Sequence, residues 1–211
     1  MGVFNLLTDK LPKTVTIDGE THDIRWKYQH VITIERALSD LSIEQSERAL
    51  YSMTLFYPGG IPESVKSAYE AMTRFISSDK PLNRTQMAAA KRLKGAPAAF
   101  SYDIDDEYIY AAFVQMYGIH LTREKDMHWF EFKALLNGLD ECPFSRIRDY
   151  RSAELNKIED KTMRKLYAEK KAFWALPESK AQQQHIDSFE DALMNGGDIS
   201  ALIAGRRQED D

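Results

Sequence analysis

Apolar residues recur along most of this chain at intervals of three and four residues, the spacing of one face of an α-helix. The clearest stripe runs over residues 65–76 and consists of Val65, Ala68, Tyr69, Met72, Phe75 and Ile76. Similar stripes predict helices after residues 27 and 42, after the acidic run at 103–107, after residue 122, and near 144–150 and 160–176. The pattern therefore predicts a mainly α protein.

Residues that satisfy free backbone groups predict where these helices begin and end. Ser42 followed by Gln45 has the form of a capping box. Pro62 is expected at a first helical position, where its missing N–H costs nothing. Gly118 is expected to end the helix after the acidic run, and Thr122 to cap the next one.

Residues 13–26 show a period of two, which is typical of a β-strand. Val15 and Ile17 alternate with threonines, and Asp18-Gly19 supplies a two-residue turn. This stretch predicts a small β-hairpin. A lone hairpin is marginally stable in water, so its apolar face must pack on helices.

The composition divides the chain into three parts. Residues 1–176 are expected to form a single helical, bundle-like domain with the hairpin packed on it. Within it, residues 78–101 are polar, basic and rich in small residues, which predicts a mobile loop. Residues 177–211 carry only a weak apolar stripe and are expected to form a loosely attached tail, helical or disordered.

Charge and cysteine content restrict the class of protein. Of the 211 residues, 43% are apolar and 29% are charged, as in an ordinary globular protein, and the formal net charge is −5. Cys142 is the single cysteine, which indicates a reducing, intracellular setting. No apolar run approaches the roughly 20 residues that span a bilayer, and the N-terminus lacks the pattern of a signal peptide. We therefore expect no membrane association.

The acidic run at 103–107 resembles the start of a calcium loop. A loop of the EF-hand type starting at Asp103 would need Gly at its sixth position and Glu at its twelfth. This chain has Tyr108 and Val114 there. Negative charge at a helix N-terminus is the better explanation.

Reactive groups elsewhere form no recognised motif. A zinc site of His120, Glu124 and His128 has weak spacing, and satisfied histidines are the simpler interpretation. Cys142 lies beside carboxylates, which disfavour the thiolate, so we expect a structural cysteine. No nucleotide-binding or serine-hydrolase motif is present. The sequence thus predicts no catalytic residue, no metal, no cofactor and no enzyme.

Basic residues concentrate at residues 80–94 and on the helix expected at 160–176. A basic loop could bind nucleic acid, but binding also needs a groove or stacking aromatics, and acidic residues alternate with the basic ones on the helix. We therefore rank nucleic-acid binding below the other functions.

Aromatic residues near the end of the domain are candidates for partner binding. Burial in the core is the commoner fate of Tyr167, Phe173 and Trp174, whereas an exposed Trp174 would be a binding hot spot. The candidate partner-binding residues, two of which lie in the tail, are Tyr167, Phe173, Trp174, Phe189 and Leu193.

Six motifs in a fixed order are similar to those of the bacteriophage gene-product-fifteen family. In chain order they are NLLTDKLP, TVTIDGETHDI, LFYPGGIPES, YIYAAFVQMYGIHL, HWFEFKALLNGL and RDYRSAELNKI. The resemblance covers residues 1–176. It implies a protein of long-tailed phages and prophages, encoded beside the tape-measure gene, with no assigned catalytic residue.

The resemblance implies a tail assembly chaperone that acts in the host bacterial cytoplasm. Its partners would be the tape-measure protein, possible copies of itself and, at a later stage, the tail-tube protein. A structural tail or connector component of the virion is the main alternative, followed by a nucleic-acid-associated protein that uses the loop at 80–94. We expect the 160–176 helix and the tail to contact the client.

Overall fold

The computed structural model describes residues 4–40, 42–78 and 98–177. Its elements, in chain order, are β1 (Thr14–Ile17), β2 (Glu20–Asp23), α1 (Tyr28–Ser39), α2 (Gln45–Phe56), α3 (Val65–Ile76), α5 (Asp106–Tyr117), α6 (Trp129–Asn137), α7 (Pro143–Ser152), the 3-10 helix η1 (Leu155–Lys157) and α8 (Lys161–Phe173). Within the described ranges, β1 and β2 form the one sheet. The prediction of a mainly α protein with a small N-terminal hairpin is confirmed.

The hairpin turns at the two residues that the sequence indicated. Asp18 and Gly19 have φ values of 51° and 91°, the left-handed conformation that a two-residue hairpin turn requires. Ile17 pairs with Glu20 across the turn. Ile17 and Ile24 are buried, and β1 contacts α3. The apolar face of the hairpin thus packs on helices.

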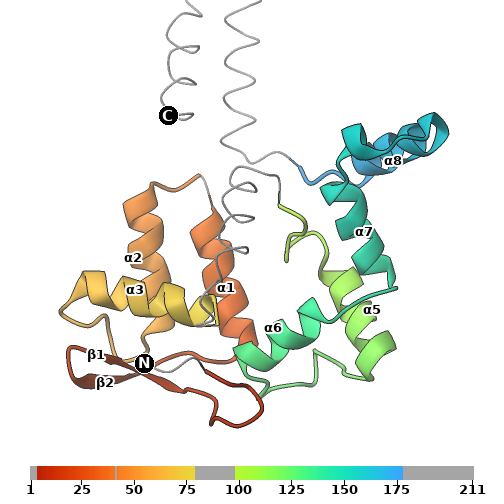
Figure 1. Ribbon diagram of the computed structural model, residues 1–211. Helices are drawn as coiled ribbons and strands as arrows, with labels where there is room; N and C mark the ends of the chain where they lie inside the picture. The colour runs from red at the N-terminus through yellow and green to blue at the C-terminus, as the bar shows by residue number, and fades with distance from the viewer. Residues whose placement is uncertain (1–3, 41, 79–97, 178–211) are drawn as a thin grey trace, which may run out of the picture.

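The helices form two groups that α6 joins (Figure 1). The hairpin, α1, α2 and α3 lie on one side, and α5, α7 and α8 lie on the other. Helix α1 packs against both α2 and α6, while α5 packs against α6 and α7. Helix α8 lies at the end of α7 farthest from the hairpin. Among the α-helices of the described ranges, α8 is the one that buries no residue.

Phe132 of α6 lies at the centre of an aromatic cluster. Its ring stacks with those of Tyr28, Phe113 and Trp129, at centroid distances of 4.7, 5.2 and 5.8 Å. Each such pair contributes about 0.5–1.5 kcal/mol beyond the burial of its apolar area. The Trp129 indole N–H also donates to the Ile76 carbonyl at 2.9 Å. Through these contacts α6 connects α1, α3 and α5.

The stripe at 65–76 forms helix α3 as predicted, but not all of it is buried. The side chains that reach the core are Ala68, Met72, Phe75 and Ile76. Val65 and Tyr69 remain 51% and 36% exposed. Helix α3 packs on α2 and β1, which cover one face and leave the edge of the stripe in solvent.

The predicted starts of α2 and α3 are wrong. Ser42 does not cap α2, because its N–H and hydroxyl both donate to the Asp40 carboxylate at 3.0 and 2.5 Å. Instead, the Glu44 carboxylate accepts from the N–H groups of Ser46 and Glu47 at 2.7 and 3.3 Å. Pro62 is buried ahead of α3, which begins only at Val65.

The helix expected after Thr122 begins instead at Trp129. Its cap is His128, whose imidazole Nδ1 accepts from the Phe130 N–H at 3.1 Å. The Glu131 carboxylate accepts from the His128 N–H at 2.9 Å, which completes a capping box. By contrast, Gly118 ends α5 in the left-handed conformation, with φ 65°, as predicted.

Candidate partner-binding surface

Helix α8 is held by its own polar residues rather than by a core. The Asp160 carboxylate caps it by accepting from the Met163 N–H at 2.7 Å. The Arg164 guanidinium folds back and donates to the Ile158 carbonyl at 2.8 Å. No residue of α8 is buried. The sequence-based expectation that its aromatic residues belong to the core is therefore wrong.

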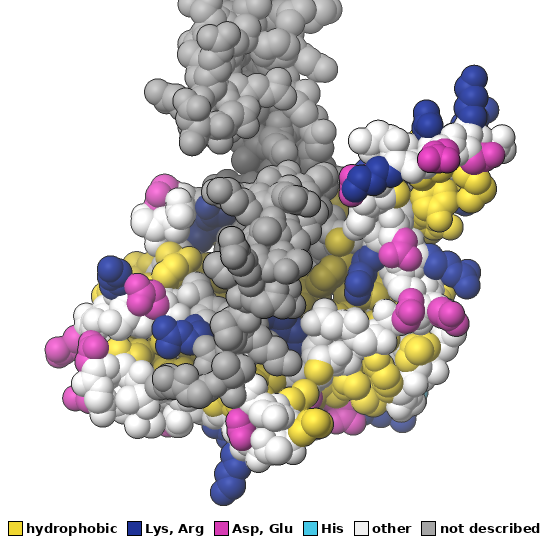
Figure 2. All heavy atoms as spheres, in the orientation of Figure 1, with side chains coloured by type: hydrophobic (Ala, Val, Ile, Leu, Met, Phe, Trp, Pro, Cys, Tyr) yellow, Lys and Arg dark blue, Asp and Glu magenta, His cyan; other side chains and the backbone are white. Residues whose placement is uncertain are grey.

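One face of α8 exposes a stripe of large apolar side chains. Met163, Leu166 and Phe173 are 44%, 43% and 76% exposed, and the exposed Lys170 lies between the last two. The spacing i, i+3, i+7 and i+10 puts all four on one face of the helix. We call these four residues the α8 stripe. Figure 2 shows hydrophobic side chains gathered along one side of α8.

The adjoining face of α8 attaches the helix to the domain. The Tyr167 ring packs edge-on against Tyr150 of α7 at 5.5 Å, and Trp174 packs edge-on against Tyr108 of α5 at 5.6 Å. Both residues are half-buried. Phe173, which contacts the Trp174 ring at 5.0 Å, is the exposed member of the predicted aromatic group. The exposed aromatic residue is thus Phe173 and not Trp174.

Two of the candidate residues named from the sequence remain. Phe189 and Leu193 lie outside the described residues. Met163 and Leu166 were not among the candidates, although their spacing from Phe173 is visible in the sequence. The spacing i, i+3 and i+10 of Met163, Leu166 and Phe173, which places them on one helix face, is the sequence signal that identifies these two residues.

Basic side chains surround the α8 stripe. Helix α8 carries Lys161, Arg164, Lys165, Lys170 and Lys171 and a single acid, Glu169, which gives a formal charge of +4. The whole chain carries −5. The protein therefore presents a basic, apolar helix on an acidic body, a surface that favours an apolar partner with acidic groups.

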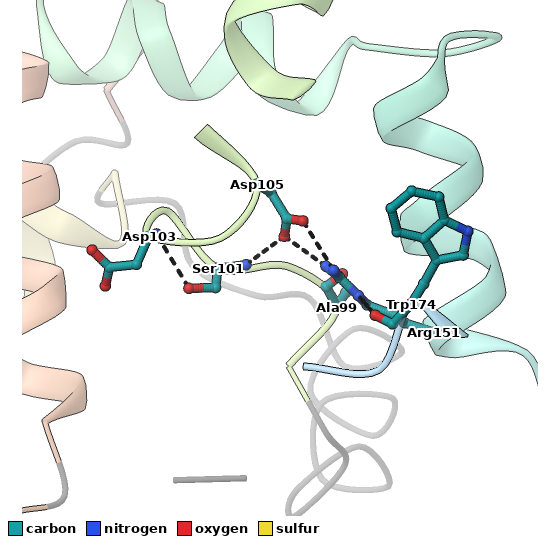
Figure 3. Close-up of polar contacts among 6 residues, drawn as sticks. All are labelled: Ala99, Ser101, Asp103, Asp105, Arg151 and Trp174. Carbon is teal, nitrogen blue, oxygen red and sulfur yellow. Dashed lines mark hydrogen bonds and ion pairs between the residues drawn. The ribbon is translucent and has the colours of Figure 1, made fainter. Parts of the chain in front are cut away.

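Arg151 of α7 fixes the end of α8 to the domain. Its guanidinium pairs with both oxygens of the Asp105 carboxylate at 2.6 and 2.9 Å, and its Nε donates to the Trp174 carbonyl at 2.6 Å (Figure 3). The same side chain donates to the Ala99 carbonyl at 3.3 Å. Asp105 also accepts from the Ser101 N–H at 2.8 Å. One buried arginine thus joins α7, the start of α5 and the end of α8.

A second polar contact supports the same junction. The Lys171 ammonium donates to the Ala153 carbonyl, just beyond the end of α7, at 2.8 Å. A cation near a helix C-terminus is favourable because the last carbonyls carry partial negative charge. Together with Arg151, this contact fixes the direction in which the α8 stripe faces.

The acidic residues at 103–107 have different structural roles. Asp106 and Glu107 occupy the first turn of α5, where negative charge is favourable. Asp103 pairs instead with Arg36 of α1 at 2.5 Å. Asp105 is 1% exposed and pairs with Arg151, so it does not cap α5 through its side chain. The interpretation as helix capping is correct only in part.

A partly buried polar cluster lies between α1 and α6. Burial raises the pKa of the Glu35 carboxyl, and the nearby Lys133 and a hydrogen bond from Tyr102 partly offset this rise. Burial lowers the pKa of Lys133, which donates to the Ile76 carbonyl at 2.8 Å. It raises the pKa of Tyr102. Each group has a partner within the fold, so the cluster needs no substrate to explain it.

His128, His120 and Cys142 have structural partners. His128 Nδ1 accepts from a backbone N–H, so Nε2 carries the proton and donates to the Pro12 carbonyl at 2.8 Å. His120 contacts the Tyr110 hydroxyl at 3.1 Å through Nδ1. Cys142 is fully buried as the cap of α7. Across the described ranges, no three such residues form a group that could hold a metal.

A cavity of about 130 Å³ lies between the N-terminal residues and α6. Its lining includes Phe4, Leu6 and Phe130, with Lys133 as its charged member. Lys133 already donates to a backbone carbonyl. The cavity therefore offers less to a partner than the α8 stripe does.

Comparison with known proteins agrees with the order of motifs in the chain. None of the helices in the described ranges is long and apolar enough to cross a membrane. No curated protein and no solved structure matches the chain. A sequence model of the family described as Bacteriophage Gp15 protein matches residues 7–176. This match spans the hairpin and every helix of the described ranges, and the chain therefore belongs to the bacteriophage Gp15 protein family.

Proposed function

We propose that this protein is a phage tail assembly chaperone that binds the tape-measure protein and keeps it soluble during tail formation. The observation that carries the proposal is the α8 stripe, in which Phe173 is 76% exposed on a helix without buried residues. Large aromatic side chains dominate the energetics of protein interfaces. The proposed role requires no enzyme activity and places the protein in the host bacterial cytoplasm.

The chemistry of the stripe suits a helical client. A tape-measure protein is a long helical chain with apolar stripes, which must stay soluble until tail-tube subunits surround it. An exposed amphipathic helix can cover such a stripe by packing in parallel or antiparallel register. The α8 stripe offers only three apolar side chains, so each contact is weak and tube subunits can displace it.

Co-expression with the tape-measure protein of the same phage or prophage tests the proposal. We expect a soluble complex that elutes together in size-exclusion chromatography, and an insoluble client when this protein is omitted. The absence of both complex and rescue would defeat the proposal. Recovery of the protein in purified virions would instead favour a structural component.

Point variants locate the binding surface. Leu166→Ser combined with Phe173→Ser should abolish the complex without unfolding the domain, because both side chains are already exposed. The matched control is Leu50→Ser combined with Tyr51→Ser on α2, where the side chains are 53% and 52% exposed. Equal loss of the complex in both pairs would show that α8 is not the binding surface.

A further inference from the structure

The α8 stripe has no cover among the described residues. Helix α8 packs mainly on α7 and η1, and Tyr167 contacts Tyr150 of α7. Trp174, which follows the last residue of α8, contacts Tyr108 of α5. The face that carries Leu166 and Phe173 remains open to solvent. Exposed apolar surface promotes association, so we expect another polypeptide segment to bind this stripe.

Charge argues against a second copy as the occupant. Two α8 helices packed face to face would each bring a formal charge of +4 to the same interface. Lys170, in the middle of each stripe, would then lie close to the lysine of the other copy. Like charges across a contact destabilise it. The occupant should therefore be apolar and acidic.

Residues 178–211 of the same chain have this composition. They contain eight acidic and three basic side chains, which gives a formal charge of −5. Within them, Ile186, Phe189 and Leu193 follow the spacing i, i+3 and i+7 of one helix face, and Glu190 adjoins that face. The segment thus has an apolar stripe with Glu190 beside it. This arrangement complements the α8 stripe, in which Lys170 lies among the apolar side chains.

The length of the connection permits the contact. Residue 178 follows α8 by only a few residues, and the nine residues from 178 to 186 can span up to about 30 Å. Helix α8, with 13 residues, is only about 20 Å long. The segment can therefore turn back and lie antiparallel along α8.

We propose that residues 186–193 cover the α8 stripe when no partner is bound, with Ile186, Phe189 and Leu193 on its apolar side chains and Glu190 opposite Lys170. A short connection gives such a contact an effective concentration in the millimolar range. The cover protects the stripe from non-specific association. A client must displace this cover. Its apparent affinity is therefore the intrinsic affinity multiplied by the fraction of molecules in which the stripe is uncovered.

This inference rests on the proposed function only for the identity of the displacing partner. The contact itself belongs to the free protein and can be measured without any client. A variant of the full chain with Leu166→Cys and Leu193→Cys reports it, because mild oxidation joins the two thiols when they meet. The native Cys142 is fully buried and does not compete.

We expect an intramolecular disulfide that forms at least ~tenfold faster than in a control with Leu50→Cys and Leu193→Cys. Leu50 is 53% exposed on α2, in the other group of helices. Equal rates in the two variants would overturn the proposal. A disulfide-linked dimer whose rate rises with protein concentration would also overturn it, in favour of a second copy.

A charge exchange tests the register. Lys170→Glu should slow the formation of the disulfide, and the addition of Glu190→Lys should restore the rate, because the pair is then present with its charges reversed. Failure of the restoration would show that these two residues do not face each other. If the disulfide forms and the client remains insoluble in co-expression, the proposed function fails while the intramolecular contact stands.

Discussion

Arg151 and Asp105, 46 residues apart in the chain, form an ion pair whose side chains are only 5% and 1% exposed. The guanidinium meets both carboxylate oxygens, a geometry that suits arginine and that lysine cannot reproduce. The Nε–H of Arg151 donates to the Trp174 carbonyl at the end of α8. The pair therefore determines both the packing of α7 on α5 and the position of α8.

Removing one partner of this pair should be costly. Arg151→Met leaves the Asp105 carboxylate buried without its countercharge, and we expect a loss of about 3–5 kcal/mol in the free energy of unfolding. Chemical denaturation measures this loss. The control is Arg146→Met, an exposed arginine on the same helix, which should change stability by less than about 0.5 kcal/mol.

A double variant separates the charge from the packing. Arg151→Met combined with Asp105→Leu removes both charges, and we expect it to recover part of the stability lost by Arg151→Met alone. If the double variant is as unstable as the sum of the two single variants, the loss comes from the hydrogen bonds to Trp174 and Ser101 and not from an uncompensated charge.

Gly118 offers a test of backbone conformation with little interference from packing. Its φ of 65° lies in the left-handed region, and an added Cβ would meet nothing within 4 Å. Gly118→Ala should therefore cost about 1 kcal/mol in the free energy of unfolding, all of it from the backbone. Gly59→Ala is the matched control, since Gly59 has open space and no positive φ. A loss at Gly118 no larger than at Gly59 would contradict this account.

His128 should make the protein sensitive to mild acid. Burial lowers the pKa of its imidazole below 6.5, and the neutral form accepts from the Phe130 N–H through Nδ1. Because the unfolded chain binds the proton at higher pH than the folded one does, the stability from this group is present above pH 6.5 and is lost as pH falls through the folded pKa. We therefore expect the denaturant concentration at the midpoint of unfolding to decrease as the pH is lowered from about 7 to about 5.5.

His128→Asn tests the origin of this acid sensitivity. An asparagine can still cap α6 but does not titrate, so its stability should change less over the same range of pH. His30→Asn is the control, since the side chain of His30 is exposed and does not cap α1. An unchanged pH dependence in His128→Asn would assign the sensitivity to other groups.

The hairpin and the core faces of the helices could be predicted because their signals are local. Asp18-Gly19 permits the turn that forms, and Met72 and Phe75 lie on the buried face that their spacing indicates. Caps were harder to predict. His128 and Glu44 perform the role usually given to serine or aspartate, and only the position of the backbone N–H groups reveals it.

The helix at 161–173 was predictable from the sequence, but its exposed face was not. Residues 160–176 were expected to contact a partner, yet the spacing of apolar residues could not tell the attached face from the exposed one. Tyr167 and Trp174 face the domain because Tyr150 and Tyr108 lie opposite them, and Arg151 fixes that arrangement across 23 residues of chain. Contacts between segments that are distant in the sequence decide which face of α8 is attached and which is exposed, and no local sequence pattern predicts these contacts.

Helix α8 should be the first helix to melt when its cap is removed. Asp160→Ala deletes the carboxylate that accepts from the Met163 N–H, a change that typically costs a helix about 1 kcal/mol. Since α8 has no buried residue, few packing contacts can offset this loss, and the helix should fray without unfolding the domain. Hydrogen exchange should show faster exchange in residues 161–173 and unchanged protection at Phe113 and Phe132. The control is Asp149→Ala, an exposed residue within α7, which should leave α8 unaffected. Loss of protection throughout the protein in Asp160→Ala would show that α8 is instead part of the cooperative core.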